Sequence, residues 1–156
     1  MCCSMVSFYN KILENIILPA GDLFLGTNYI SELKKWRKIS RLKEHELYDL
    51  SIINLRKLLA YATSSVPFYR AYSKVEVSDP VAWLKKFPVI NKDDYNNDID
   101  SFLSVPKDKL IASYSSGSSG VQGVVYMNKK EQSSAQAIQT LLWEWSGYYP
   151  GKPIVQ

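Results

Sequence analysis

The feature that most constrains the fold is a run of small polar residues between two strand-like segments. Five serines and three glycines fall within residues 113–123, between Leu110–Ala112 and Val124–Tyr126. The β-branched and aromatic residues predict short strands at 110–114 and 123–127. The run between them can be a flexible connection. It can also bind an anion, because glycine lets backbone N–H groups converge and serine hydroxyls add donors. The residues alone leave both interpretations open.

Two helices are predicted in the first 40 residues. The first has the apolar positions Phe8, Ile12, Leu13, Ile16 and Ile17, and we expect Pro19 and Gly21 to end it. An apolar turn at residues 23–26 should follow. Ile30, Leu33 and Trp36 then form one face of a short helix whose other face is basic, with Lys34, Lys35, Arg37 and Lys38. That face is either a solvated helix surface or a contact with an anionic membrane.

The clearest helical pattern lies between residues 47 and 65. Ile52, Leu55, Leu59 and Ala62 recur at helical spacing, and Leu47, Leu50 and Leu58 widen the stripe. Pro67 then forces a turn. We expect Phe68, Tyr69 and Tyr72 to anchor this turn on a core rather than line a site.

Three further helices have readable N-termini. Asp79 with Pro80 begins one, whose expected buried residues are Val81, Leu84 and Phe87. Asn91 caps the next helix, which has Asp93 and Asp94 in its first turn. The spacing of these two residues with Asp98 and Asp100 matches no calcium-binding loop. Asn128 and Glu131 form a capping box for a long helix. Its expected buried stripe is Ala135, Ile138, Leu142 and Trp145, with Leu141 beside it, and Pro153–Gln156 resembles the start of a strand.

Composition narrows the function classes. The chain has 156 residues, 46% of them hydrophobic and 22% charged, as in a soluble globular domain. A net charge of +4 without a basic-aromatic motif gives no indication of nucleic-acid binding. The adjacent Cys2 and Cys3 and the single His45 form no disulfide framework and no metal site. Lys11 and Glu14 interrupt the apolar start, so we expect a cytoplasmic protein without a signal peptide.

The run resembles the phosphate-binding loop of the adenylate-forming enzymes, whose usual pattern is [ST]-S-G-[ST]-[ST]-G-x-P. Other segments resemble the phenylacetate–coenzyme A ligase-like family, in that family's order. They are Leu58–Ala62 with Val66–Arg70, Phe87–Asp94, and Ile17–Gly26 with the helix that follows, the last resembling the capsular-polysaccharide-biosynthesis branch. The resemblance implies an α/β fold in which a helical portion, residues 1–109, precedes the start of a mixed sheet and nucleotide-binding core, residues 110–156.

The activity implied by the resemblance is that of an ATP-dependent ligase. A carboxylate and ATP give an acyl-adenylate and pyrophosphate, and coenzyme A or another acceptor then takes the acyl group. Mg²⁺ is implied as a cofactor. The residues carried over for the β- and γ-phosphates are Ser115, Ser116, Gly117, Ser118, Ser119 and Gly120. No catalytic residue is carried over.

Two departures from the family pattern limit what the 156 residues can do. Gln122 stands where the family has proline, and no lysine follows at Gly123; the next is Lys129. The family's later motifs for adenine, ribose and the catalytic lysine do not occur in these residues, so we expect no ligase activity from them alone. The alternatives are a non-enzymatic remnant or a membrane-surface interaction module that uses the N-terminal helices.

Overall fold

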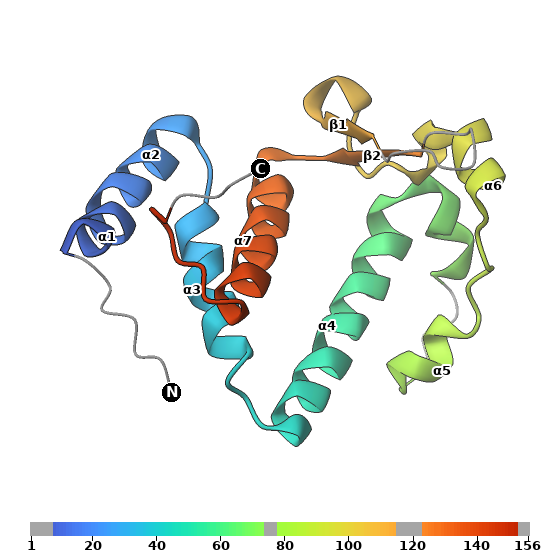
Figure 1. The fold of residues 1–156 in the computed structure, drawn as a ribbon. Helices are drawn as coiled ribbons and strands as arrows, with labels where there is room; N and C mark the ends of the chain where they lie inside the picture. The colour runs from blue at the N-terminus through green and yellow to red at the C-terminus, as the bar shows by residue number, and fades with distance from the viewer. Residues whose placement is uncertain (1–7, 74–77, 115–122, 153–156) are drawn as a thin grey trace. The chain divides into compact units, whose positions relative to one another are not determined.

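The computed structural model describes residues 8–73, 78–114 and 123–152. The chain divides into two compact units, unit 1 with residues 1–41 and 128–156 and unit 2 with residues 42–127 (Figure 1). Helices come first along the chain and a two-stranded sheet follows, which confirms the expected order of an α/β chain. The division into residues 1–109 and 110–156 stays a prediction.

The elements follow one another with short connections. They are α1 Phe8–Ile12, the π-helical η1 Leu13–Ile17, α2 Leu18–Leu25, α3 Tyr29–Ile39, α4 Glu44–Ser65, the 3₁₀ turn η2 Pro67–Tyr72, α5 Pro80–Leu84, α6 Lys92–Asn97, the 3₁₀ turns η3 Ile99–Phe102 and η4 Lys107–Lys109, β1 Ile111–Tyr114, β2 Val124–Met127 and α7 Lys129–Trp145. Within the described parts of the chain, no helix combines the length and the apolar character needed to cross a membrane.

The core of unit 1 lies between α3 and α7. Leu33 and Ala137 are fully buried there, and Ile30 and Leu141 are nearly so, which confirms the predicted inner face of α3. The stripe predicted for α7 was wrong at Ala135, Leu142 and Trp145, which are exposed, whereas Ile138 is half-buried and Leu141, expected beside the stripe, is buried. The buried residues of α7 are instead Ser133, Ala137, Thr140 and Leu141.

Small side chains explain why α7 packs through this other face. Ser133 and Thr140 can be buried because their hydroxyls donate to the carbonyls of Lys129 (2.7 Å) and Gln136 (3.0 Å) of the same helix. With Ala137 between them, they leave little bulk between the two helix backbones. Close backbone approach therefore outweighs the burial of larger side chains here.

The N-terminal helix is longer than predicted. It continues through Pro19 and Gly21 to Leu25, and Gly26 ends it in the left-handed conformation with φ 67°. The segment expected to be an apolar turn, residues 23–26, is thus mostly helical. Pro19 is tolerated because the π-helical turn η1 precedes it and places it in the first turn of α2, where no backbone N–H is needed.

Aromatic side chains hold unit 2 together. Phe68 stacks on Phe102 at 4.2 Å between ring centroids, and Tyr72 stacks on Phe87 at 5.2 Å. Leu59 of α4 is buried, as its helical pattern predicted, but Leu47 and Leu58, which were expected to widen the stripe, are exposed. The turn at Pro67 is therefore anchored by packed aromatic rings, which confirms the structural interpretation of these residues.

The predicted helix starts are confirmed, but the inner face of α5 was wrong. The Asp79 carboxylate accepts from the N–H groups of Val81 and Ala82, and Asn91 and Asn128 cap α6 and α7 in capping boxes. Val81 and Leu84 are exposed, at 36% and 46%, whereas Trp83 is buried. Trp83 occupies the buried side of α5 because its large ring packs edge-on against Phe87.

A candidate phosphate-binding hairpin

The Ser/Gly run joins two paired strands. β1 and β2 are antiparallel, with Ile111 opposite Met127 and Tyr114 opposite Val124, which confirms both predicted strands. Opposite residues in such a pair have Cα atoms about 5 Å apart, so the run starts and ends at neighbouring points. The candidate residues Ser115, Ser116, Gly117, Ser118, Ser119 and Gly120 lie outside the described residues, and their role stays a prediction.

A lysine that the sequence did not single out lies beside this hairpin. The Nζ of Lys107, in the turn η4 before β1, is 5.0 Å from the centre of the Tyr126 ring on β2. A hydrogen bond with Tyr126 raises the pKa of Lys107. Sequence reasoning looked for a cation after the run, at Gly123 or Lys129. No spacing rule relates Lys107 to Tyr126, because Lys107 belongs to a 3₁₀ turn before β1 and Tyr126 lies on the other strand.

Lys107 also borders an open depression of unit 2. This hollow of about 430 Å³ is lined by Ser65, Pro67, Arg70, Asp100, Leu103, Ser104, Val105, Pro106 and Lys107. Two cations, one carboxylate and two hydroxyls face a space large enough for a small polar molecule. The chemistry of the lining suits an anionic group, with Arg70 and Lys107 as its counter-charges.

A second hollow of unit 2 has an apolar lining. It measures about 300 Å³ and is formed by Leu58, Leu59, Ala62, Tyr69, Leu84, Phe87 and Pro88. Burial is the main cause that raises the pKa of Tyr69, and the nearby Tyr72 raises it further. The phenol is therefore neutral at physiological pH. The phenol can therefore act as a neutral hydrogen-bond donor at the edge of an apolar surface.

The acidic residues of α6 stabilise that helix. Asp93 and Asp94 occupy its first turn, and the Asp94 carboxylate accepts from the N–H of Asn91 at 3.1 Å. Across the described ranges, no three His, Cys, Asp or Glu side chains are grouped so that they could hold a metal ion. A structural role at the start of α6 therefore explains the carboxylates of Asp93 and Asp94.

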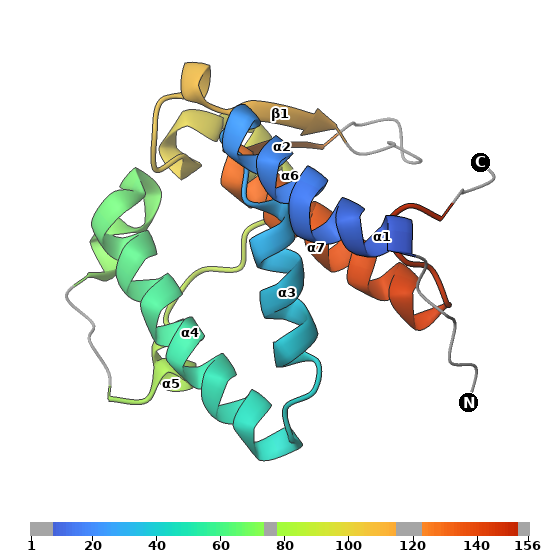
Figure 2. The ribbon, with the colours of Figure 1, turned by 90° about the vertical axis from the view of Figure 1, so that its left-hand side faces the viewer.

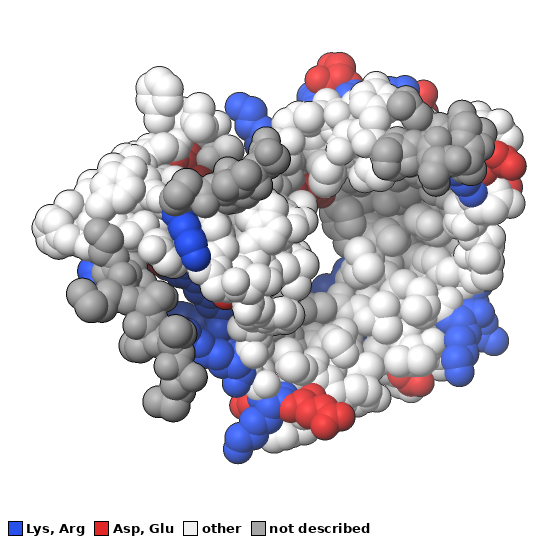
Figure 3. Space-filling view, viewed as in Figure 1, with Lys and Arg blue, Asp and Glu red and all other residues white. Residues whose placement is uncertain are grey.

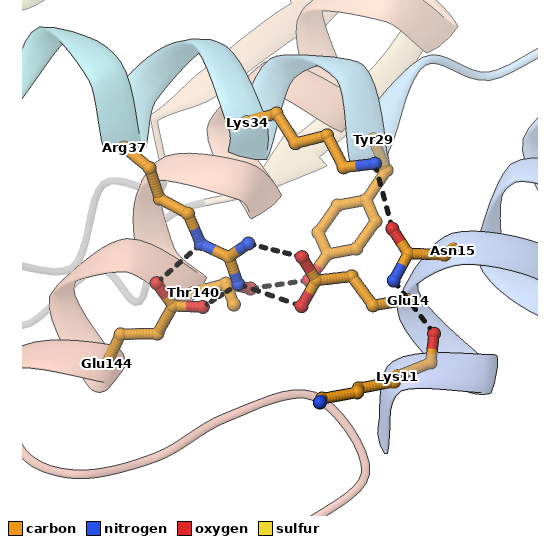
Figure 4. Close-up of polar contacts among 8 residues, drawn as sticks. All are labelled: Lys11, Glu14, Asn15, Tyr29, Lys34, Arg37, Thr140 and Glu144. Carbon is orange, nitrogen blue, oxygen red and sulfur yellow. Dashed lines mark hydrogen bonds and ion pairs between the residues drawn. The ribbon is translucent and has the colours of Figure 1, made fainter. Parts of the chain in front are cut away.

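The densest charge cluster lies in unit 1 and joins three helices (Figure 4). Arg37 of α3 contacts the Glu14 carboxylate at 2.5 and 3.1 Å and the Glu144 carboxylate at 2.5 and 2.9 Å. The hydrogen bonds with Glu144 raise the pKa of Arg37 above its usual value, and those with Glu14 add a smaller increase. Next to it, the phenol of Tyr29 shares a hydrogen bond of 2.9 Å with Thr140. These contacts use four of the five N–H groups of the guanidinium, and we interpret the cluster as a structural clamp.

Comparison with known proteins gives one distant relationship. No protein-family model matches the chain, and no solved structure matches it. The chain is 27% identical over 146 residues to Protein CapK of Staphylococcus aureus, a match that covers 90% of this chain and 32% of that protein. The chain spans about a third of the length of this curated relative. Over nearly all of its own length, the chain is thus similar to Protein CapK at the level of a distant relative.

Proposed function

We propose that the chain is the phosphate-binding part of an ATP-dependent, acyl-adenylate-forming ligase related to capsule biosynthesis. One observation carries the proposal: the pattern Ser-Ser-Gly-Ser-Ser-Gly at residues 115–120 directly connects two paired antiparallel strands. The distant relationship to Protein CapK supports the link to capsule biosynthesis. Because the chain spans a third of that protein, the complete reaction is proposed for a longer polypeptide.

The donor set of the hairpin fits a phosphate chain. Residues 110–128 contain serine hydroxyls and glycine N–H groups but no carboxylate, so nothing in this segment repels an anion. In the proposed reaction a carboxylate oxygen displaces pyrophosphate from the α-phosphate of ATP, which leaves an acyl-adenylate. Ser115–Gly120 would stabilise the charge that develops on the departing pyrophosphate.

Mg²⁺ would neutralise part of the phosphate charge when bound. Magnesium prefers carboxylate, phosphate and water oxygens. Since residues 110–128 hold no carboxylate, this segment contributes hydroxyl and amide groups to the phosphates and no acidic ligand to the metal ion. Coenzyme A, as a thiol acceptor, belongs to the second half of the proposed reaction, and no residue of this chain is assigned to it.

Nuclear magnetic resonance of the glycine amides tests phosphate binding directly. The chain has seven glycines, and Gly117, Gly120 and Gly123 fall in or next to the run. We expect their amide signals to shift when ATP or pyrophosphate is added and to stay in place with adenosine. The Ser116→Ala/Ser118→Ala variant should bind at least about 100-fold more weakly, since each of its two lost hydrogen bonds to a charged group contributes about 1.5–3 kcal/mol.

The matched control is Ser113→Ala, because Ser113 is exposed in β1 and precedes the candidate residues 115–120. It should bind pyrophosphate as the parent chain does. Shifts that occur equally with adenosine, or that survive the Ser116→Ala/Ser118→Ala change, would contradict the proposal. ATP–pyrophosphate exchange should be absent with the 156-residue chain and a panel of carboxylic acids, and clear turnover would contradict the expected inactivity of the chain alone.

A further inference from the structure

The N-terminal helical segment of unit 1, α1–η1–α2, directs its polar groups inward. The Asn10 side chain donates to the carbonyl of Pro150 at 2.7 Å, and Glu14 pairs with Arg37. The Asp22 carboxylate accepts from the backbone N–H groups at the start of α3, at 3.1 and 2.8 Å. Both carboxylates of this segment are therefore used within unit 1.

The opposite side of the same segment is apolar and faces solvent. Leu23 is 87% exposed and Phe24 90%, and Phe8, Tyr9, Ile16, Ile17 and Leu25 are between 48% and 78% exposed. Figure 2 shows α1 and α2 as the outer layer that lies across α3 and α7. In Figure 3 the surface over these two helices is largely white. A helical segment that turns its carboxylates inward and exposes its large hydrophobic residues is the reverse of an ordinary surface helix.

Lysines border this apolar side. Lys11 is an exposed residue of α1 itself. The Nζ of Lys34 lies 3.4 Å from the Asn15 side-chain oxygen, and the Nζ of Lys129 lies 3.4 Å from the Leu25 carbonyl. Lys34 and Lys129 thus contact polar atoms of the segment, at the residue before the exposed Ile16 and at the exposed Leu25 itself.

The net charge of the chain is also concentrated in this unit. The described residues of unit 1, 8–41 and 128–152, contain nine Lys and Arg against five Asp and Glu. The described residues of unit 2 contain nine of each. The formal charge of +4 therefore belongs to the unit that exposes the apolar helix side.

We propose that the outer side of α1–η1–α2 docks on a membrane surface that contains anionic phospholipids. The segment of 18 residues is roughly 27 Å long at 1.5 Å per residue. Its exposed side chains would enter the boundary between headgroups and acyl chains, while the lysines contact lipid phosphates. The net positive charge of unit 1 favours binding to an anionic bilayer. The segment forms the outer layer of unit 1, so it can lie along a membrane surface over its whole length.

The sequence suggested a membrane contact either through the basic-aromatic helix or through the N-terminal helices as a group. In the basic-aromatic helix, Ile30 and Leu33 are buried in the core of unit 1. The apolar residues of α3 are therefore not available to lipid. Lys34 still serves the proposed surface, because its side chain reaches the neighbouring helical segment.

Vesicle co-sedimentation with the full chain tests the apolar part of the proposal. We expect binding to phosphatidylcholine vesicles that contain phosphatidylglycerol and much weaker binding to phosphatidylcholine alone. The Leu23→Gln/Phe24→Gln variant should bind about tenfold more weakly. The matched control is Leu58→Gln/Tyr61→Gln on α4 of unit 2, where both side chains are also exposed, at 61% and 52%. That control should bind like the parent chain.

A second pair of variants tests the charged part. Removing a lysine near an anionic surface should weaken binding about fivefold, so Lys11→Gln/Lys129→Gln should lose about 25-fold. The control Lys85→Gln/Lys86→Gln removes the same charge from unit 2 and should leave affinity nearly unchanged. Circular dichroism checks that all variants keep their helices, which is expected because the changed hydrophobic side chains are exposed.

Several results would overturn the proposal. The chain could fail to sediment with anionic vesicles, or the α4 and Lys85/Lys86 controls could lose as much affinity as the matched variants. Leu23→Gln/Phe24→Gln could also bind like the parent chain. Self-association that requires Leu23 and Phe24, measured by gel filtration without vesicles in a chain that does not bind lipid, would assign the surface to a protein contact instead.

Discussion

Replacing Arg37 by methionine should destabilise unit 1 strongly. The change keeps a long side chain but removes the group that links Glu14 to Glu144, whose side chains are only 23% and 16% exposed. Two carboxylates would then face each other without their counter-ion. Breaking a buried ion pair costs about 3–5 kcal/mol, and partial exposure reduces this to about 2–4 kcal/mol.

The loss is best measured as a change in the free energy of unfolding of unit 1. Three of the four tryptophans, Trp36, Trp143 and Trp145, belong to this unit, so tryptophan fluorescence during urea unfolding follows it preferentially. Arg41→Met is the matched control, since Arg41 is exposed just beyond α3. It should change stability by less than about 0.5 kcal/mol.

A triple variant separates charge from packing. Arg37→Met combined with Glu14→Gln and Glu144→Gln removes all three charges, and it should regain much of the stability lost by Arg37→Met alone. If Arg37→Met unfolds like the parent chain, the three-helix clamp contributes no more than an exposed ion pair. If the triple variant is less stable than Arg37→Met, the cost arises from lost packing and not from unpaired carboxylates.

Two further predictions concern single residues of unit 1. Burial raises the pKa of Tyr29 above 10.0, although its hydrogen bond with Thr140 acts in the opposite direction. The folded state thus holds the phenol proton more tightly than the unfolded chain does. The contribution of Tyr29 to the free energy of unfolding is therefore fully present below about pH 10, and it is lost as pH rises through the pKa of the folded state. Tyr29→Phe should reduce this alkaline fall in urea unfolding, and an unchanged slope would contradict it. Gly26→Ala should lower the free energy of unfolding by about 1–2 kcal/mol because φ is 67° at this residue. Gly21→Ala, inside α2, should raise it by about 0.5–1 kcal/mol. The opposite order would show that Gly26 does not end the helix.

Local signals in the sequence predicted local structure well. Asp79, Asn91 and Asn128 mark helix starts because a capping side chain bonds to backbone groups only two or three residues away. The two strands were predicted because β-branched and aromatic residues flank the Ser/Gly run. Such features depend on neighbours in the chain and need no knowledge of tertiary contacts.

Features that depend on distant contacts were missed. Periodicity chose Leu142 and Trp145 as the inner face of α7, but the partner helix α3 required the small face around Ala137. Pro19 was read as a helix end because a π-helical turn has no reliable sequence signal. At the candidate site, the hairpin was predictable, whereas the approach of Lys107 to Tyr126 depends on how the chain turns before β1.

The division of the chain into units has a consequence for the order of folding. Unit 1 is discontinuous, because α3 and its partner α7 are separated by the whole of unit 2, whereas residues 42–127 of unit 2 are contiguous. During synthesis, α3 must wait for residues 129–145 to leave the ribosome before Leu33 and Ala137 can meet. Unit 2 can fold first and so shortens the effective loop that unit 1 must close. We therefore expect the α3–α7 core to form after unit 2.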